Sequence, residues 1–140
     1  MKKIMIINGP NLNLVGVREP EVYGSKSMDQ YVGELKILFP EVTIGYYQSN
    51  IEGEIVGKIQ EVGFDCAGIV INAGGYSHTS VAIHDAVKSV SAPVIEVHIS
   101  NIFAREEYRH HSLLGSACRG MICGLGLDGY RLAIENLLAC

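Results

Sequence analysis

The stretch IMIINGPNLNLVGVREPEVYG (residues 4–24) begins with four consecutive apolar side chains and then turns polar. The run at 4–7 is too short for a typical helix and suits a strand buried on both faces, as in a parallel sheet. The following residues 8–24 include three asparagines, two prolines, an arginine and a tyrosine. Such a composition packs poorly in a core and is typical of a functional loop. We therefore expect a ligand site where this strand ends.

Short apolar runs recur along the chain, separated by apolar stripes at helical spacing. This alternation is typical of an α/β fold with a parallel sheet. The expected strands cover residues 4–7, 42–47, 68–71, 94–97 and 120–123. Five parallel strands with intervening helices suit a flavodoxin-like three-layer sandwich with strand order 2-1-3-4-5, although periodicity by itself leaves other orders open.

The helical stripes predict four helices, at about 28–39, 51–62, 79–90 and 128–138. Ser27 and Gln30 form a candidate capping box for the first helix, and Pro40 would stop it. Gly63 is expected to end the second helix in the left-handed conformation.

Length and charge indicate a single domain that acts on a small molecule. The 140 residues suit one catalytic domain over 1–140, and 48% hydrophobic content is ample for one core. With 11 basic and 15 acidic residues the net charge is -4, and no basic face is concentrated enough to favour nucleic acid or a membrane as partner.

The chain carries no pattern typical of a membrane span, a secretion signal or a metal site. No apolar run reaches the roughly 18 residues of a membrane span, and the first apolar run is too short for a signal peptide. The four cysteines form no CxxC pair and have no histidine at zinc-finger spacing. We expect a cytoplasmic protein with reduced thiols that needs neither a metal nor a disulfide.

Three polar loops follow three of the expected strands, at 8–24, 72–80 and 98–101. In the 2-1-3-4-5 topology a ligand binds beyond the carboxyl ends of the strands, where the strand order reverses. We therefore expect the three loops to meet in one crevice.

The first and third of these loops hold a candidate acid–base pair. Tyrosine normally titrates at about 10, so Tyr23 becomes a usable base only if a nearby cation such as Arg18 stabilises the phenolate. His98 can deliver a proton to a leaving hydroxyl. Strand alternation places Glu96 on the same side as His98, where it can orient the imidazole.

The same loops are rich in groups that bind anions. Gly74 and Gly75 let backbone amides approach a ligand closely, and Arg105 and Arg109 supply forked donors. Together with His78, these groups point to an anionic, hydroxylated small molecule. They favour proton transfer over hydride or phosphoryl transfer.

Each of these residues also has a purely structural interpretation. Tyr23 taken alone suits a loop aromatic packed on the surface, and His98 suits a strand-end imidazole bonded to backbone. Asp85 suits an exposed helix charge, and Arg109 a surface ion pair. The three asparagines of the first loop suit turn formers.

Several long motifs, in order and spread over nearly the whole chain, resemble the type II 3-dehydroquinate dehydratases. The matching stretches are NGPNLNLVGVREPEVYG (8–24), QSNIEGE (48–54), YSHTSVAIHDA (76–86), EVHISNIFAREEYRHHS (96–112) and GLGLDGY (124–130). The resemblance implies a flavodoxin-like hydro-lyase of the shikimate pathway, which leads to chorismate and the aromatic amino acids. It converts 3-dehydroquinate to 3-dehydroshikimate without cofactor or metal, commonly as a homododecamer of four trimers.

The resemblance also implies roles for individual residues. Tyr23 would abstract the proton beside the ketone, and His98 would protonate the departing hydroxyl. Arg18 would help keep Tyr23 ionised, while Asn11 would position a water against the enolate oxygen. The remaining substrate ligands implied by the match are Asn72, His78, Asp85, Ile99, Ser100 and Arg109.

The chain departs from the usual family pattern at a few positions away from the expected acid and base. Ala73 replaces a frequent proline, His84 a common arginine and Phe103 a frequent histidine, and the segment 113–118 is atypical. These departures leave open the shape of the connection before the last strand.

Other interpretations remain at this point. One is a non-catalytic flavodoxin-like module for a nucleotide or flavin, although the chain lacks both the GxxxxGK[ST] and the GxGxxG phosphate motifs. An inactive paralogue that serves in assembly is another, and the same reaction in quinate catabolism is a third.

Overall fold

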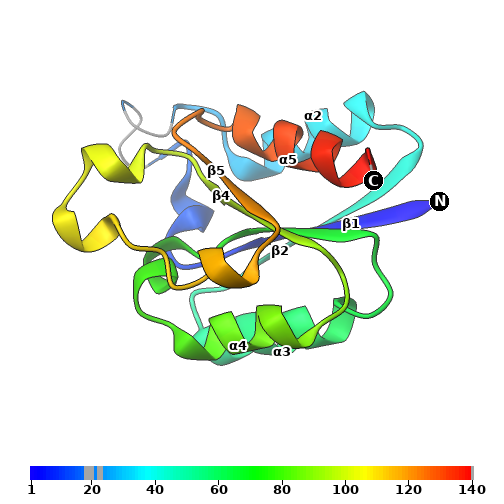
Figure 1. Cartoon of the computed structure of the whole chain (residues 1–140). Coiled ribbons are helices and arrows are strands. Elements are labelled where there is room, and N and C mark those ends of the chain that lie inside the picture. The colour runs from blue at the N-terminus through cyan, green and yellow to red at the C-terminus, as the bar shows by residue number, and fades with distance from the viewer. Residues whose placement is uncertain (18–20, 22–23, 140) are drawn as a thin grey trace.

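A five-stranded parallel sheet forms the centre of the molecule (Figure 1). The structure, a computed structural model, describes residues 1–17, 21 and 24–139. The strand order β2-β1-β3-β4-β5 confirms the flavodoxin-like 2-1-3-4-5 prediction. The strands are β1 (Lys2–Asn8), β2 (Val42–Gln48), β3 (Gly68–Asn72), β4 (Val94–His98) and β5 (Gly120–Cys123).

Helices cover both faces of this sheet, which makes three layers. The helices are α2 (Met28–Leu38), α3 (Glu52–Val62), α4 (Val81–Ser89) and α5 (Asp128–Leu138). Figure 1 shows α2 and α5 on one face and α3 and α4 on the other. Among the described residues, no helix combines the length and apolarity that crossing a membrane requires.

Alternate residues of the strands enter two separate hydrophobic cores. On β1, Ile6 packs into the core beneath α2 and α5, whereas Ile7 packs into the core beneath α3 and α4. On β3, Val70 faces the first core, and Ile69 and Ile71 face the second. Because successive side chains of a strand point to opposite faces, burial on both sides requires an unbroken apolar run. This is the reason that the short runs of the sequence located the strands.

The helix ends agree with the predicted boundaries within two residues and correct one predicted cap. At α2 the capping box is present: Ser27 Oγ accepts from the Gln30 backbone amide, and the Gln30 side chain accepts from the Ser27 amide. The left-handed cap predicted at Gly63 is wrong, because its φ is -70°. A Cβ at this position would instead collide with the side chain of Val90 and the carbonyl of Ile59. Close packing against Val90 and Ile59 therefore explains why position 63 is a glycine.

The loops after β1 and β3 are held against each other at the carboxyl edge of the sheet. The Gly9 amide donates to the Asn72 carbonyl at 2.8 Å, and a Cβ on Gly9 would overlap the backbone of Ala73. Asn11 then adopts a left-handed conformation, with φ 71°, which asparagine tolerates better than most residues. A short 3-10 helix, Leu12–Leu14, follows.

The connection between β4 and β5 is long and compact. It contains three short 3-10 helices, Ile102–Ala104, Glu107–Arg109 and Gly115–Ala117. The Leu113 amide donates to the Ser77 carbonyl at 2.7 Å, which fastens the connection to the loop after β3. The atypical segment 113–118 therefore begins beside the loop after β3, and it leads to the start of β5, where the Arg119 amide donates to the Val94 carbonyl at 2.7 Å.

Candidate active site

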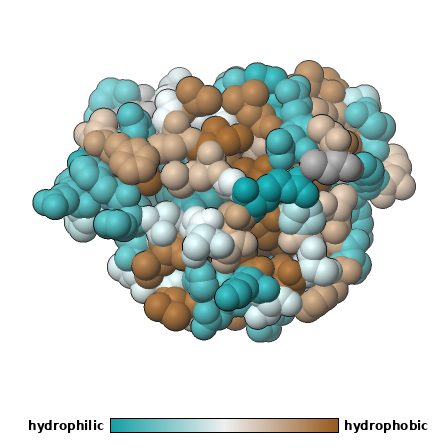
Figure 2. Space-filling model, in the orientation of Figure 1, coloured by the Kyte–Doolittle hydropathy of each residue, from teal (hydrophilic) through white to brown (hydrophobic). Residues whose placement is uncertain are grey.

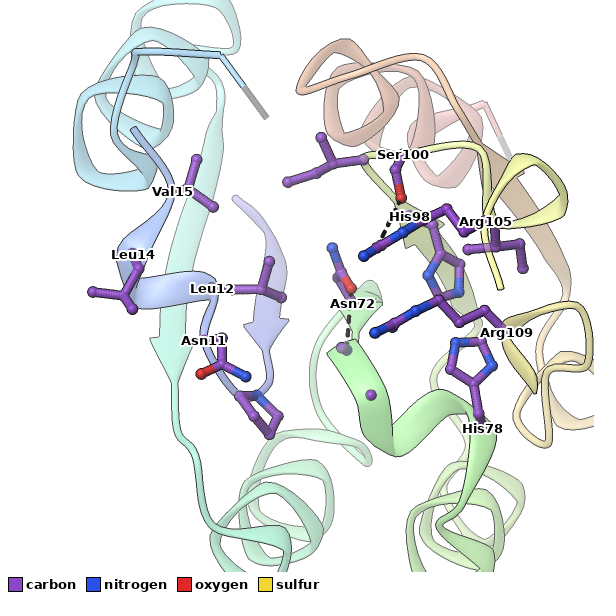
Figure 3. Close-up of a pocket in the computed structure, with 15 residues that line it drawn as sticks. Asn11, Leu12, Leu14, Val15, Asn72, His78, His98, Ser100, Arg105 and Arg109 are labelled. Atoms are coloured by element: carbon purple, nitrogen blue, oxygen red, sulfur yellow. Dashed lines mark hydrogen bonds between the residues drawn. The ribbon is translucent and has the colours of Figure 1, made fainter. Parts of the chain in front are cut away.

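A cavity opens at the carboxyl edge of the sheet, where three loops meet (Figure 3). Its described lining residues come from the last residues of β3 and β4 and from the loops after β1, β3 and β4, which confirms the predicted convergence. These residues are Pro10, Asn11, Leu12, Leu14, Val15, Asn72, Gly74, Gly75, His78, His98, Ile99, Ser100, Ile102, Arg105 and Arg109.

Most of the residues expected at the site from the sequence lie at this cavity. The expected residues that line it are Asn11, Asn72, His78, His98, Ile99, Ser100 and Arg109. Asp85 does not line it within this chain, because its carboxylate lies on α4, is 69% exposed and pairs with His84 Nδ1 at 3.0 Å. Arg18 and Tyr23 lie outside the described residues.

His98 ends β4 and forms a buried pair with Glu96. Its Nε2 lies 2.5 Å from Glu96 Oε2, and the Glu96 side chain is 0% exposed. The predicted contact along the strand is therefore present. An ionised carboxylate only accepts hydrogen bonds, so Nε2 carries the hydrogen and Nδ1 is the nitrogen available to a ligand.

His78 stacks beside His98 and is fixed in the complementary way. The two ring centroids lie 6.1 Å apart with 24° between the planes. His78 Nδ1 donates to the His111 carbonyl at 2.7 Å, which leaves Nε2 as an acceptor. Burial lowers the pKa of His78, and the nearby His98 and Arg109 lower it further, against the opposing effect of the hydrogen bond to His111. The surroundings therefore favour the neutral ring over the imidazolium.

Two arginines give the cavity a positive lining (Figure 3). Arg105 Nη1 donates to Ser100 Oγ at 3.4 Å, and Arg109 Nε donates to Glu106 Oε2 at 2.8 Å. None of the described residues that line the cavity is an aspartate or glutamate. Such a lining suits an anionic ligand with hydroxyl groups.

A buried network of polar side chains holds Asn72 at the floor of the cavity. Asn72 Nδ2 donates to the Tyr130 hydroxyl at 3.0 Å, and that hydroxyl donates to Asn8 Oδ1 at 2.8 Å. Asn72 Oδ1 accepts from the Gly74 amide at 3.2 Å. These bonds use one of the two Asn72 amide hydrogens and fix the direction of the other. The role of Tyr130, which lies within the helix predicted at 128–138, was missed from the sequence.

A second set of hydrogen bonds fixes the loop after β1. Asn50 Oδ1 accepts from the Asn11 amide at 3.0 Å and from Gln48 Nε2 at 3.1 Å. Gln48 Nε2 also lies 3.1 Å from the Gly9 carbonyl. Gln48 and Asn50 both belong to the sequence motif QSNIEGE, but only the fold brings them into contact with the loop after β1.

Among residues 1–17, 21 and 24–139, no three His, Cys, Asp or Glu side chains are grouped so that they could hold a metal ion. The polar lining described above comes instead from imidazole, guanidinium, amide and hydroxyl groups.

Comparison with known proteins places this geometry in a family. The family model described as dehydroquinase class II matches residues 2–138. The chain belongs to the class II dehydroquinase family. A relative from Exiguobacterium sp., named 3-dehydroquinate dehydratase, is 48% identical over 97% of this chain and 94% of its own length. The Campylobacter jejuni protein of the same name is 50% identical over 97% of this chain and 87% of its own length.

A solved structure confirms that this chain has the fold of the family. The type II dehydroquinase from Butyrivibrio crossotus superposes with a TM-score of 0.94 at 48% identity, covering 98% of this chain and 97% of that chain. Sequence and fold therefore lead to the same enzyme family.

Proposed function

We propose that this chain dehydrates 3-dehydroquinate to 3-dehydroshikimate through tyrosinate proton abstraction, an enolate intermediate and histidine-assisted loss of water. Family membership supports the overall reaction and its place in the shikimate pathway. The observation that carries the mechanism is the buried Glu96–His98 pair, which lies at a cavity with a cationic lining.

In the first step the Tyr23 phenolate removes a proton from the carbon beside the ketone. The C–H electron pair moves toward the ketone, and the carbonyl oxygen becomes an enolate oxygen. Arg18 would keep the phenol ionised by charge, since a nearby cation favours the phenolate. Both roles rest on the match of residues 8–24 to the family pattern.

In the second step the enolate collapses, the carbonyl reforms and the bond from the neighbouring carbon to its hydroxyl breaks. His98, protonated on both nitrogens, gives its Nδ1 proton to the departing hydroxyl, which leaves as water. Throughout, Nε2 keeps its hydrogen toward Glu96, whose carboxylate balances the imidazolium charge. Asn11 would position a water against the enolate oxygen.

The remaining lining residues would bind the substrate. Backbone amides at Ile99 and Ser100 and the guanidinium of Arg109 suit the carboxylate, while Asn72 and His78 suit hydroxyl groups. Asp85 stays a prediction from the resemblance, because it does not reach the cavity of its own chain.

The direct test is to add 3-dehydroquinate and follow the ultraviolet absorbance of the conjugated enone product. We expect activity from the wild type and losses of about 10²- to 10⁴-fold in kcat for Tyr23→Phe and for His98→Ala, as for removal of a general base or acid. Well-folded wild-type protein without any absorbance change would contradict the proposed reaction.

A chemical control separates this mechanism from imine catalysis. Borohydride added with substrate should leave activity intact, because no lysine lies among the matched motifs. Mass spectrometry that found a reduced substrate adduct on a lysine, together with inactivation, would refute the tyrosinate mechanism.

We also propose, from the resemblance, that the chain assembles as a homododecamer of four trimers. Exposed apolar side chains such as Phe103, Tyr108 and Leu125 are compatible with subunit contacts. In Figure 2 hydrophobic residues interrupt the hydrophilic surface of the face shown. Light scattering after size exclusion should give the mass of twelve chains of 15.2 kDa. A single-chain mass at micromolar concentration would overturn this proposal.

A further inference from the structure

Ser112 contacts the buried carboxylate of Glu96, which also bonds His98. Its hydroxyl lies 2.8 Å from Oε1 and 2.7 Å from Oε2 of Glu96. The same oxygen accepts the Leu114 amide at 3.2 Å and the Gly115 amide at 3.1 Å. Ser112 does not line the cavity.

The two backbone amides determine which way the Ser112 hydroxyl donates. A hydroxyl has two acceptor lone pairs and one hydrogen. Because the amides of Leu114 and Gly115 occupy the lone pairs, the hydrogen is directed to Glu96. The carboxylate therefore receives hydrogen bonds from Ser112 and from His98 Nε2.

The turn that carries Ser112 is firmly anchored. Leu114 is 0% exposed and packs into the core beneath α3 and α4. The Leu113 amide donates to the Ser77 carbonyl at 2.7 Å. The hydroxyl is thus held at a fixed position by packing and backbone bonds that are independent of Glu96.

We propose that Ser112 is a positioning residue for the dehydration: its hydroxyl holds Glu96 as an ionised acceptor for the Nε2 hydrogen, and this carboxylate stabilises the doubly protonated His98 that donates from Nδ1 to substrate. This inference rests on the proposed role of His98. Without the Ser112 hydroxyl, the buried carboxylate loses a donor, and its protonated form becomes more favourable. A protonated Glu96 donates to Nε2 instead of accepting from it, which leaves the ring neutral with its hydrogen on Nδ1. A neutral imidazole is a far weaker acid than the imidazolium, so proton transfer to the departing hydroxyl slows.

The test compares Ser112→Ala with Ser116→Ala, a matched change in the same segment at an exposed serine away from Glu96. We expect Ser112→Ala to lower kcat about 10- to 100-fold, the effect of one lost hydrogen bond to a charged group, with KM changed less than about 3-fold. The acidic limb of its pH–kcat profile should move to higher pH. Ser116→Ala should match the wild type in all three.

Nitrogen-15 NMR of the His98 ring provides a readout that a merely structural role would not change. The neutral ring of the wild type should carry its hydrogen on Nε2, and Ser112→Ala should show a mixture of tautomers. Ser112→Thr, which keeps the hydroxyl, should restore kcat to within about 3-fold of the wild type. If Ser112→Ala does not fold, Ser112→Cys replaces it, since a thiol is a weak donor of similar size.

The outcomes separate this inference from the proposed function. If His98→Ala is as active as the wild type, the acid assignment fails, whatever Ser112 variants do. If His98→Ala is inactive while Ser112→Ala keeps the kcat, pH profile and tautomer of the wild type, the positioning role is overturned. Equal losses in folded Ser112→Ala and Ser112→Thr would overturn it as well.

Discussion

Tyr130 illustrates how a single buried hydroxyl connects the core to the site. Its side chain is fully buried on α5, yet its oxygen bridges Asn72 at the cavity and Asn8 at the end of β1. A buried polar group without a partner is costly, so each of the three side chains depends on the others. The hydroxyl therefore contributes to stability and to the placement of Asn72.

We predict that Tyr130→Phe lowers the free energy of unfolding by about 1–3 kcal/mol, because it leaves Asn72 Nδ2 and Asn8 Oδ1 without their partner. Urea unfolding followed by circular dichroism measures the change. KM for 3-dehydroquinate should also rise, since Asn72 is no longer held in place.

Tyr31→Phe is the matched control for that substitution. The Tyr31 ring packs edge-on against Tyr130 at 6.2 Å, but its buried hydroxyl has no hydrogen-bond partner among the described residues. Its removal should therefore cost little or even stabilise the protein. Equal losses of stability in the two variants would contradict the argument from hydrogen bonding.

At the scale of single elements, helix α2 shows local sequence determining local structure. Its capping box joins residues only three positions apart, Ser27 and Gln30, and Lys26 pairs with Glu34 at 2.8 Å. Both capping bonds satisfy amides that the first helical turn leaves free. The exposed Lys26–Glu34 pair contributes little by comparison.

We predict that Ser27→Ala destabilises the fold by about 1 kcal/mol, the usual cost of a lost N-cap. Thermal unfolding should show a lower Tm, whereas Ser25→Ala, two residues earlier and exposed, should leave it unchanged. Since α2 does not line the described cavity, kcat at 25 °C should remain at the wild-type value. Loss of activity without loss of stability would count against this assignment.

At the scale of the whole molecule, the burial of weakly acidic side chains makes the stability of the fold decrease at alkaline pH. Burial raises the pKa of Tyr31 to about 12, and burial followed by the nearby Glu96 carboxylate raises the pKa of Cys118 to about 12. Burial also raises the pKa of Tyr130, Tyr46 and Cys66. All five groups are held in their neutral forms by the fold.

The sign of the effect follows from the ordinary values of 10.0 for tyrosine and 9.0 for cysteine. Above those values the unfolded chain loses protons that the folded chain retains, so unfolding becomes more favourable as pH rises. We predict that the free energy of unfolding measured in urea is constant from about pH 7 to about pH 8.5 and then falls, by at most about 1.4 kcal/mol per pH unit for each group.

Tyr31→Phe serves as the control in that titration, because it removes one of the groups and should make the fall less steep above about pH 10. A free energy of unfolding that stays constant up to pH 11 would show that these side chains titrate in the folded state as they do in water.

The sequence by itself determined the strands, the α2 cap, the family and most of the residues at the cavity, and it favoured the observed strand order without excluding others. Periodicity, capping and loop chemistry are local, and parallel topology brings the carboxyl ends of strands together. The sequence also placed Glu96 beside His98, because strand alternation relates residues two apart.

Only the tertiary structure decided which distant side chains meet. It brought Tyr130 to Asn8, Ser112 to Glu96 and Asn50 to Asn11, and it gave Gly63 a packing reason in place of a left-handed cap. It also left Asp85 away from the cavity of its own chain. Such contacts join residues far apart along the chain, and they are selected by packing and by the need to satisfy buried polar groups, which no local pattern records.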